Sequence, residues 1–253
     1  MMFLLFILTL VNSQTCTHSS NVAQKKIVTQ KPSWDYHNLV LTWQGNFCAG
    51  SNCCDLPSST MSIRPGFTIH GWWPEYNSGY PEYCPYPSGL TFDAVTKMIK
   101  DDEEFKQDIA YYWPSERKCK FFEYEYEKHG TCLADVYDGE TGPKDYAMAA
   151  INFVKKHDFW KLLKINGIIA DGNTKNNIEL MRQIVCEELG LDRCATFQCS
   201  DEYLTEIWIC TTATKDTKEL PTPIECPSEA TDTCSGFAKL QPPVDLTEGG
   251  CEY

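Results

Sequence analysis

The 253-residue sequence is poor in positive charge. Its 22 Lys and Arg face 35 Asp and Glu, which gives a formal net charge of −13. This charge balance argues against a protein that binds nucleic acid through its overall charge, because such proteins have an excess of Lys and Arg. Any anionic substrate must be held by a few local cations. A disordered chain is also disfavoured, since 42% of the residues are hydrophobic and 13% are aromatic.

Long apolar runs are scarce as well. Phe3 to Val11 is almost wholly apolar, but it is shorter than the ~20 residues that a transmembrane helix needs. Its position, followed by the small Ser13, predicts a signal peptide over residues 1–13, although the usual positive charge before the apolar run is missing. The alternative is an apolar strand or core segment. We expect no membrane anchor further along the chain.

Cysteine, in contrast, is abundant. All 14 cysteines follow residue 13, and such a number is rare in the reducing cytosol but ordinary in secreted proteins. The even count permits seven disulfides, whose pairing spacing alone does not fix. A zinc site is the alternative use of these thiols. However, no CxxC pair is followed by a second pair or by HxxxH, so we expect neither a metal site nor another cofactor.

Strand and helix patterns follow one another without a repeat or a clean linker, which predicts a single α+β domain. Strands are expected at residues 39–43, 67–70 and 205–212. Helices are expected at residues 92–112, 121–131, 143–163 and 178–189, the last closed by Gly190. The domain is assigned to residues 14–212. Residues 213–253, rich in Thr, Pro, Glu and Cys, are expected to form an irregular extension packed on it and held by disulfides.

Two of the five histidines lie in unusual contexts. The first segment reads Phe67-Thr-Ile-His70-Gly-Trp-Trp-Pro-Glu75. A His at a strand end beside Gly and Pro lies where loops meet the scaffold, a common position for reactive groups. The two adjacent Trp offer flat faces on which a nucleobase can stack. The alternative is a half-buried aromatic turn with an incidental His.

The second segment reads Phe121-Phe-Glu-Tyr-Glu-Tyr-Glu-Lys-His129-Gly-Thr-Cys132. On a helix Glu125 lies four residues before His129, and Lys128 lies three after Glu125, so a carboxylate, an ammonium and an imidazole share one face. Glu125 is expected to raise the pKa of His129 and to orient it, while Lys128 acts in the opposite sense. The alternative is an ordinary solvated helix face.

Together the two segments indicate more than either alone. Two imidazoles can divide general base and general acid work, because they titrate near neutrality. Lys128 and Glu125 can stabilise and position a charged pentacoordinate phosphorus. The other three histidines, His18, His37 and His157, are expected to be solvated or structural. A metal-dependent phosphodiesterase is disfavoured because the clustered carboxylates and histidines of a two-metal site are missing.

The two segments resemble the active-site motifs of the T2 ribonucleases. The first family motif reads HGLWP, where this chain has His70-Gly-Trp-Trp-Pro74. The second reads roughly WEHEWxKHGTC, where this chain has Phe122-Glu-Tyr-Glu-Tyr-Glu-Lys-His-Gly-Thr-Cys132. The order, the separation and the flanking cysteines also fit, over roughly residues 36–212, and the branch of the family is left open.

The resemblance implies a disulfide-rich α+β domain with a central antiparallel sheet flanked by helices. It also implies a metal-independent endoribonuclease that cleaves single-stranded RNA through a 2′,3′-cyclic phosphate. His129 then matches the general base and His70 the general acid, with Glu125 and Lys128 stabilising the transition state. Trp73 matches an aromatic that stacks on a base, and Glu75 falls where a base-contacting acid often lies.

The chain departs from the family pattern at several positions. A third His, thought to help bind phosphate, is replaced by Tyr124, which can still donate a hydrogen bond but carries no positive charge. The motif's tryptophans are Phe122 and Tyr126, and its Leu is Trp72. The family also suggests disulfides between Cys84 and Cys132, between Cys48 and Cys53 or Cys54, and between Cys199 and Cys210. The resemblance assigns no partner to Cys234 and several other cysteines, which are expected to hold the C-terminal extension.

Two functions from different classes remain at this stage. The first is the endoribonuclease, monomeric and secreted or held in the lumen of the secretory and lysosomal pathway. The second is a secreted binding or effector protein on the same scaffold with little turnover, which Tyr124 and the Cys-rich extension motivate. The presence of His70, Glu125, Lys128 and His129 together favours the enzyme.

Overall fold

A computed structural model describes residues 34–48, 63–87, 90–115, 120–213 and 220–243. Its strands are β1 (Tyr36–Trp43), β2 (Phe67–Glu75), β3 (Asn176–Asn177), β4 (Ala195–Ser200), β5 (Tyr203–Thr212), β6 (Thr222–Pro223) and β7 (Phe237–Ala238). Its helices are α1 (Gln44–Cys48), α2 (Phe92–Asp101), α3 (Glu103–Tyr112), α4 (Phe121–Lys128), α5 (Gly142–Lys156), α6 (Phe159–Ile165) and α7 (Ile178–Leu189), with the 3₁₀ turn η1 (Gly130–Leu133) after α4. The predicted α+β architecture with an antiparallel sheet is confirmed.

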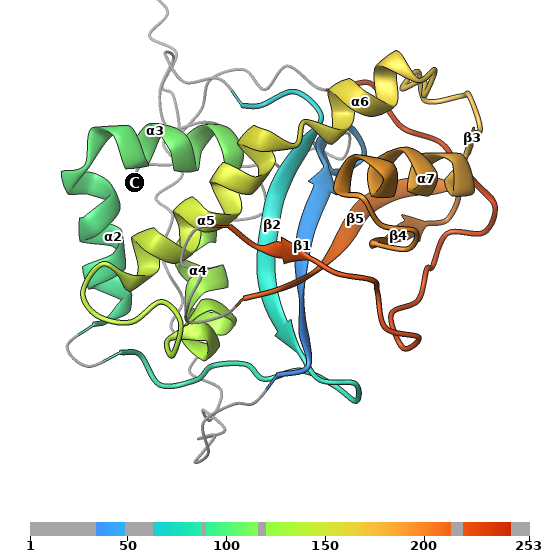
Figure 1. The fold of residues 1–253 in the computed structure, drawn as a ribbon. Coiled ribbons are helices and arrows are strands. Elements are labelled where there is room, and N and C mark those ends of the chain that lie inside the picture. Colours follow the sequence, from blue (N-terminus) through green and yellow to red (C-terminus); the bar gives the residue numbers. More distant parts are fainter. Residues whose placement is uncertain (1–33, 49–62, 88–89, 116–119, 214–219, 244–253) are drawn as a thin grey trace, which may run out of the picture.

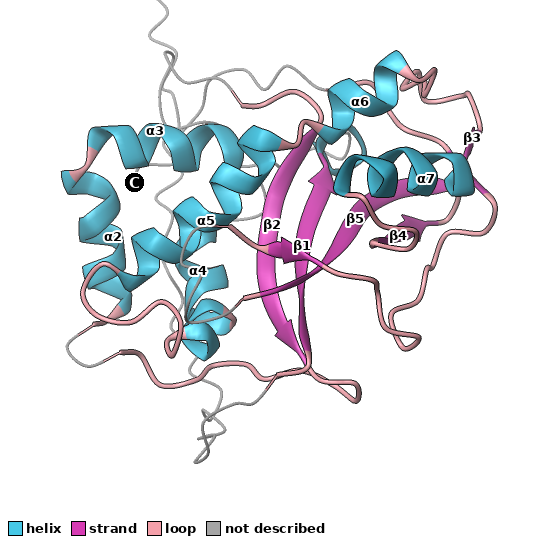
Figure 2. Cartoon of the chain, in the orientation of Figure 1, coloured by secondary structure: helices cyan, strands magenta, loops and turns pink. Residues whose placement is uncertain are grey.

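The central sheet has the strand order β2-β1-β5-β4, with the short β6 paired to β5. All its pairings are antiparallel. Figure 1 shows α2, α3, α4 and α5 gathered beside β2, whereas α6 and α7 lie toward β5 and β4. The sheet therefore forms the spine between two groups of helices, which Figure 2 shows in cyan around the magenta strands.

The two faces of the sheet differ in chemistry because side chains alternate along each strand. The core face carries Leu39, Leu41, Trp43, Ile207 and Ile209, each at most 1% exposed and part of one hydrophobic cluster with residues of the helices. The opposite face, here called the site face, carries Thr42, Trp73, Glu206 and Trp208. The same few strands thus build the core and present polar and aromatic groups behind it.

The helix predictions hold for α7, which spans residues 178–189 and ends at Gly190 with a left-handed φ of 71°. Two long predicted helices are instead each split by an aspartate. Asp102 ends α2 and caps α3 by accepting from Phe105 N, and Asp158 caps α6 by accepting from Lys161 N. A short carboxylate that satisfies free helix N–H groups competes with helix continuation, and periodicity alone does not reveal it.

The strand predictions were correct in place but short. β2 does not stop at His70 but continues through Pro74 to Glu75. Proline is tolerated there because β2 is an edge strand of the sheet. β4 was not predicted at all. The predicted helix at 121–131 is α4 followed by the 3₁₀ turn η1, and His129 lies at the junction between them.

Four disulfides lie within the described residues, and they correct the predicted pairing. Cys84–Cys132 is confirmed, but Cys199 pairs with Cys234 rather than with Cys210. Cys210 pairs with Cys226, next to a fourth bridge between Cys186 and Cys194. The predicted bridge from Cys48 to Cys53 or Cys54 lies outside the described residues.

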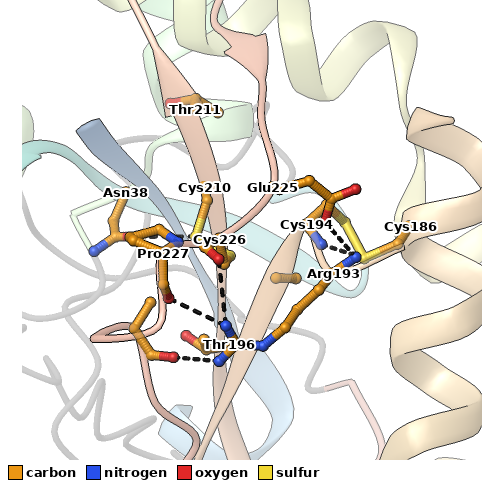
Figure 3. The surroundings of a disulfide bond; sticks show 12 residues. Asn38, Cys186, Arg193, Cys194, Thr196, Cys210, Thr211, Glu225, Cys226 and Pro227 are labelled. Carbon is orange, nitrogen blue, oxygen red and sulfur yellow. Dashed lines mark hydrogen bonds between the residues drawn. A yellow bond between two sulfur atoms is a disulfide. The ribbon is translucent and has the colours of Figure 1, made fainter. Parts of the chain in front are cut away.

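After β5, the described residues 220–243 are joined to β4 and β5 by the Cys199–Cys234 and Cys210–Cys226 bridges. Figure 3 shows the Cys210–Cys226 bridge beside Arg193, whose guanidinium donates to the carbonyl oxygens of Cys226, Pro227 and Ala230. Backbone N–H groups of Asp192 and Arg193 bind the Glu225 carboxylate. In the part of the chain that the structure describes, no helix is both long and apolar enough to cross a bilayer.

Candidate active site

His70 projects from an irregularity in β2. Gly71 pairs with Val40 and Ile69 pairs with Leu41, so the register shifts and His70 is the extra residue of a β-bulge. A bulge bends its strand and redirects the side chain that it carries. The indole of Trp113 donates to the His70 carbonyl oxygen at 2.9 Å, which holds the backbone at this point.

Glu125 of α4 lies between the two motif histidines. Its Oε1 is 3.8 Å from His70 Nε2, and its Oε2 is 4.0 Å from His129 Nε2. The α4–β2 packing therefore joins residues 70, 125 and 129 from the two sequence segments into one cluster. The helix spacing of Glu125 and His129 holds even though α4 ends at Lys128, because His129 N still donates to Glu125 O at 2.8 Å.

Trp73 fills the space between the two imidazoles. Its ring stacks on His129 with centroids 5.0 Å apart and meets the His70 ring edge to face at 4.9 Å. Its Nε1 donates to Glu125 Oε2 at 2.9 Å. Gly71 is what allows this approach, since a Cβ there would lie 2.0 Å from Trp73 Nε1 and 2.7 Å from Glu125 Oε2.

His129 is almost fully buried, at 3% exposed. Burial holds its pKa well below the ordinary value, and the positive charges of Lys128 and His70 act in the same direction. The expectation that Glu125 would raise the pKa of His129 is thus wrong, because removal from water outweighs the carboxylate. Its Nδ1 has no hydrogen-bond partner within the described residues. The imidazole is kept neutral and able to accept a proton.

His70 has a different environment, which includes a residue that the motifs did not reveal. Glu206 of β5 places Oε1 2.6 Å from His70 Nδ1. Its Oε2 accepts from Trp208 Nε1 at 2.8 Å. Glu206 is 136 residues from His70 in sequence. The alternation of residues 205–210 could have suggested that Glu206 and Trp208 share a face, but not which histidine they meet.

The remaining predicted site residues lie around this cluster. Lys128 Nζ is 3.9 Å from Glu82 Oε2. Tyr124 hydrogen bonds with Tyr83, which precedes the bridged Cys84. Glu75 accepts from Asn38 Nδ2 at 3.3 Å, and burial raises its pKa to about 7.

The cluster provides complementary proton chemistry around one carboxylate. His129 is buried and its pKa is lowered, whereas the two ring nitrogens of His70 face the carboxylates of Glu206 and Glu125. Two titratable groups with such opposite environments are suited to act as base and acid in one reaction. In the described ranges, no group of three or more His, Cys, Asp or Glu side chains is arranged to hold a metal ion.

The model of the ribonuclease T2 family matches residues 34–226. Ribonuclease 1 of Arabidopsis thaliana is 29% identical over 185 residues, which cover 70% of this chain and 75% of that protein. Extracellular ribonuclease LE of Solanum lycopersicum is 26% identical over 229 residues, 89% of this chain and 90% of that protein.

Solved structures show the same fold. An RNase-related protein from Calystegia sepium superposes with a TM-score of 0.63 at 23% identity, covering 83% of this chain and 98% of that one. RNase NT, solved in complex with 5′-AMP, gives a TM-score of 0.62 at 23% identity and covers 83% of this chain and all of that one, 100%. The chain belongs to the ribonuclease T2 family and is an endoribonuclease of the T2 type.

Proposed function

We propose that this T2 ribonuclease is secreted, needs no metal, and cleaves single-stranded RNA by transphosphorylation. The ribose 2′-hydroxyl attacks its own phosphate, the bond to the 5′-oxygen breaks, and the products end in a 2′,3′-cyclic phosphate and a 5′-hydroxyl. One observation carries the proposal: His70 and His129 converge on Glu125 from opposite electrostatic environments. Such a pair can take a proton and give one within the same site.

His129 acts as the general base in this proposal. The attacking 2′-hydroxyl must lose its proton, and a neutral imidazole accepts it. Because burial lowers the pKa of His129, the base stays unprotonated in mildly acidic solution. Lys128 adds a positive charge near this base, where it can offset the charge that builds on the phosphoryl oxygens.

His70 acts as the general acid. The departing 5′-oxygen needs a proton, and the imidazolium of His70 supplies it from Nε2 while Nδ1 is held by Glu206. Glu125, which lies within 4.0 Å of both rings, positions them toward one phosphate. His70 gives one proton and His129 takes one, so the step conserves protons. After the step His70 is neutral and His129 is protonated.

Substrate binding depends on stacking rather than on bulk charge. Trp73, whose indole lies beside His129, stacks on a nucleobase in this proposal. Glu75 then contacts the base, and the Tyr124 hydroxyl donates to phosphate. An unpaired strand is required because a duplex hides both base faces. We place the monomeric protein outside the cell or in the secretory and lysosomal lumen.

The test is cleavage of a uridine-rich RNA by the oxidised protein at pH 5–7.5 in excess EDTA, with the product ends analysed. We expect cyclic-phosphate ends and a pH optimum on the acidic side. His129→Phe should lower the rate about 10²- to 10⁴-fold, the usual contribution of general acid–base catalysis. His157→Phe is the matched control, because His157 is a buried histidine that instead pairs with Glu188.

The outcomes separate the enzyme from a binding protein. Cyclic-phosphate ends that vanish in His129→Phe and persist in His157→Phe support the proposed chemistry. A rate that keeps rising above about pH 8 contradicts a protonated His70 acid. A folded wild type that binds RNA without cleaving it supports an effector on a T2 scaffold, and Tyr124→His is then the first variant to examine.

A further inference from the structure

We infer that Glu206 is the positioning residue of the acid: its carboxylate fixes the ring of His70 so that Nε2 faces the leaving oxygen. This inference rests on the proposed function. The two residues lie on strands separated by β1 in the sheet, and their side chains meet over the site face with Oε1 2.6 Å from Nδ1. That distance is typical of a strong, charge-assisted hydrogen bond.

The Glu206 carboxylate is itself fixed. Trp208 Nε1 donates to Oε2 at 2.8 Å, and the Thr42 hydroxyl lies 3.4 Å from Oε1 on the neighbouring strand. Glu206 pairs with Thr42 in the β1–β5 register, so the backbone of the central strands sets its position. The residue is only 9% exposed. A carboxylate anchored at both oxygens can hold a ring in one orientation.

Holding Nδ1 determines what Nε2 can do. A carboxylate accepts a hydrogen bond only from a protonated nitrogen, so Glu206 keeps the Nδ1 proton in place in both charge states of His70. The second, transferable proton then sits on Nε2, which faces Glu125 at 3.8 Å. The bulge supplies the remaining constraint, because it turns His70 out of the strand pairing toward the helix.

Charges on every side of His70 must be considered. From α4 and its C-terminal end come Glu125, Lys128 and His129, and from β5 comes Glu206. Trp73 and Phe121 contact the ring as aromatic neighbours. Glu125 is shared between both histidines, so its removal affects base and acid together. Glu206 hydrogen bonds directly with His70, so its removal acts on the acid.

The experiment compares Glu206→Gln with Glu202→Gln, the same substitution at an exposed carboxylate that pairs with Lys239. Two substrates are used: a uridylyl dinucleotide with an alkoxide leaving group, and uridine 3′-(4-nitrophenyl phosphate), whose phenolate departs without a proton. We expect Glu206→Gln to lower kcat/KM for the dinucleotide about 10- to 100-fold, within the contribution of general acid catalysis, and to change the nitrophenyl ester less than threefold, or about 0.6 kcal/mol.

Two further readouts distinguish positioning from a structural role. The pH–rate profile of Glu206→Gln on the dinucleotide should differ from the profiles of the wild type and of Glu202→Gln, because the carboxylate that hydrogen bonds with Nδ1 is gone. The downfield Nδ1–H proton signal of His70, assigned with His70→Ala, should be present in wild type and Glu202→Gln and lost in Glu206→Gln.

Equal losses on both substrates, or an unchanged dinucleotide rate, would overturn the inference. A wild type that cleaves neither substrate would refute the proposed function. In that case the Nδ1–H signal still tests the hydrogen bond between Glu206 and His70. Its persistence in Glu206→Gln would show that Glu206 does not hold Nδ1. Its loss would support the hydrogen bond in a protein without catalytic activity.

Discussion

The two faces of the central sheet are built from adjacent residues of the same strands, yet one face packs the core and the other presents polar groups of the site. Ile207 points into the core and Glu206, one residue earlier, points to His70. The core face is apolar and packed. The site face is partly buried, and the polar side-chain atoms of Thr42, Trp73, Glu206 and Trp208 on it form hydrogen bonds. Alternation thus lets rigid packing on one side hold catalytic groups in place on the other.

The largest effect is expected on the core face. Ile207→Ala removes a side chain that is fully buried, at 0% exposed, and should lower the free energy of unfolding by about 2–5 kcal/mol. The rate per folded molecule should stay near that of the wild type. Urea denaturation and kcat/KM measured on the same samples test this. A loss of activity without a loss of stability would show that the two faces are not separable.

A comparable effect is expected on the site face, but on activity. In Gly71→Ala the new Cβ displaces Trp73 and Glu125, because it would lie within 2.7 Å of both. We expect kcat/KM to fall about 100-fold, equivalent to about 2.7 kcal/mol. Gly79→Ala is the control: its φ of +99° is unfavourable for alanine, but no atom lies within 4 Å of the added Cβ. Similar activity in the two variants would contradict the role of Gly71.

The core face also contains a titratable group, which gives a pH-dependent effect. His37 is 0% exposed, lies between Trp34 and Trp72, and burial lowers its pKa to about 3. The unfolded chain binds a proton below about pH 6.5, whereas the folded chain does so only near pH 3. Stability from this group is therefore complete above pH 6.5 and is lost as the pH falls, by up to about 1.4 kcal/mol per unit.

His37→Phe should remove that dependence. Urea denaturation of both proteins between pH 4 and 7 should show the wild type losing stability relative to the variant as the solution becomes acidic. A difference between the two proteins that stays constant with pH would mean that His37 is protonated as easily in the fold as in water.

The smallest effect is expected at the margin of the site. Tyr124→His introduces a cation where the family often has one, and should lower KM for RNA up to about fivefold at low ionic strength, since a partly exposed charge contributes at most about 1 kcal/mol. Tyr124→Phe removes the hydroxyl without adding charge. If both variants behave alike, the hydrogen bond with Tyr83 matters and the charge does not.

Sequence alone predicted the parts of the molecule that depend on local pattern. Helix α7, strands β1 and β5, and the Cys84–Cys132 bridge follow from periodicity, a terminal Gly190 and the family motifs. The features that it could not predict depend on competing local hydrogen bonds or on contacts between residues far apart in sequence. Asp102 and Asp158 end helices that periodicity would continue, and Cys199 finds its partner in a tail with no regular pattern.

The site shows the same limit. Glu125 and His129 could be placed together because one helix fixes their spacing, but their burial, which reverses the expected pKa direction, comes from Trp73 on another element. Glu206 could not be assigned to His70 because strand order brings them together across β1. A β-bulge that redirects one side chain also leaves no clear mark in sequence.

Two of the disulfides lie close in sequence to the residues of the site. Cys84–Cys132 closes three residues after His129, and Cys210–Cys226 closes four residues after Glu206. Cross-links of this kind restrict the unfolded chain and form in oxidising compartments. A newly made, reduced chain therefore lacks the restraints beside both histidine environments. Reduction of these two bridges is therefore expected to release the chain beside His129 and beside Glu206 together.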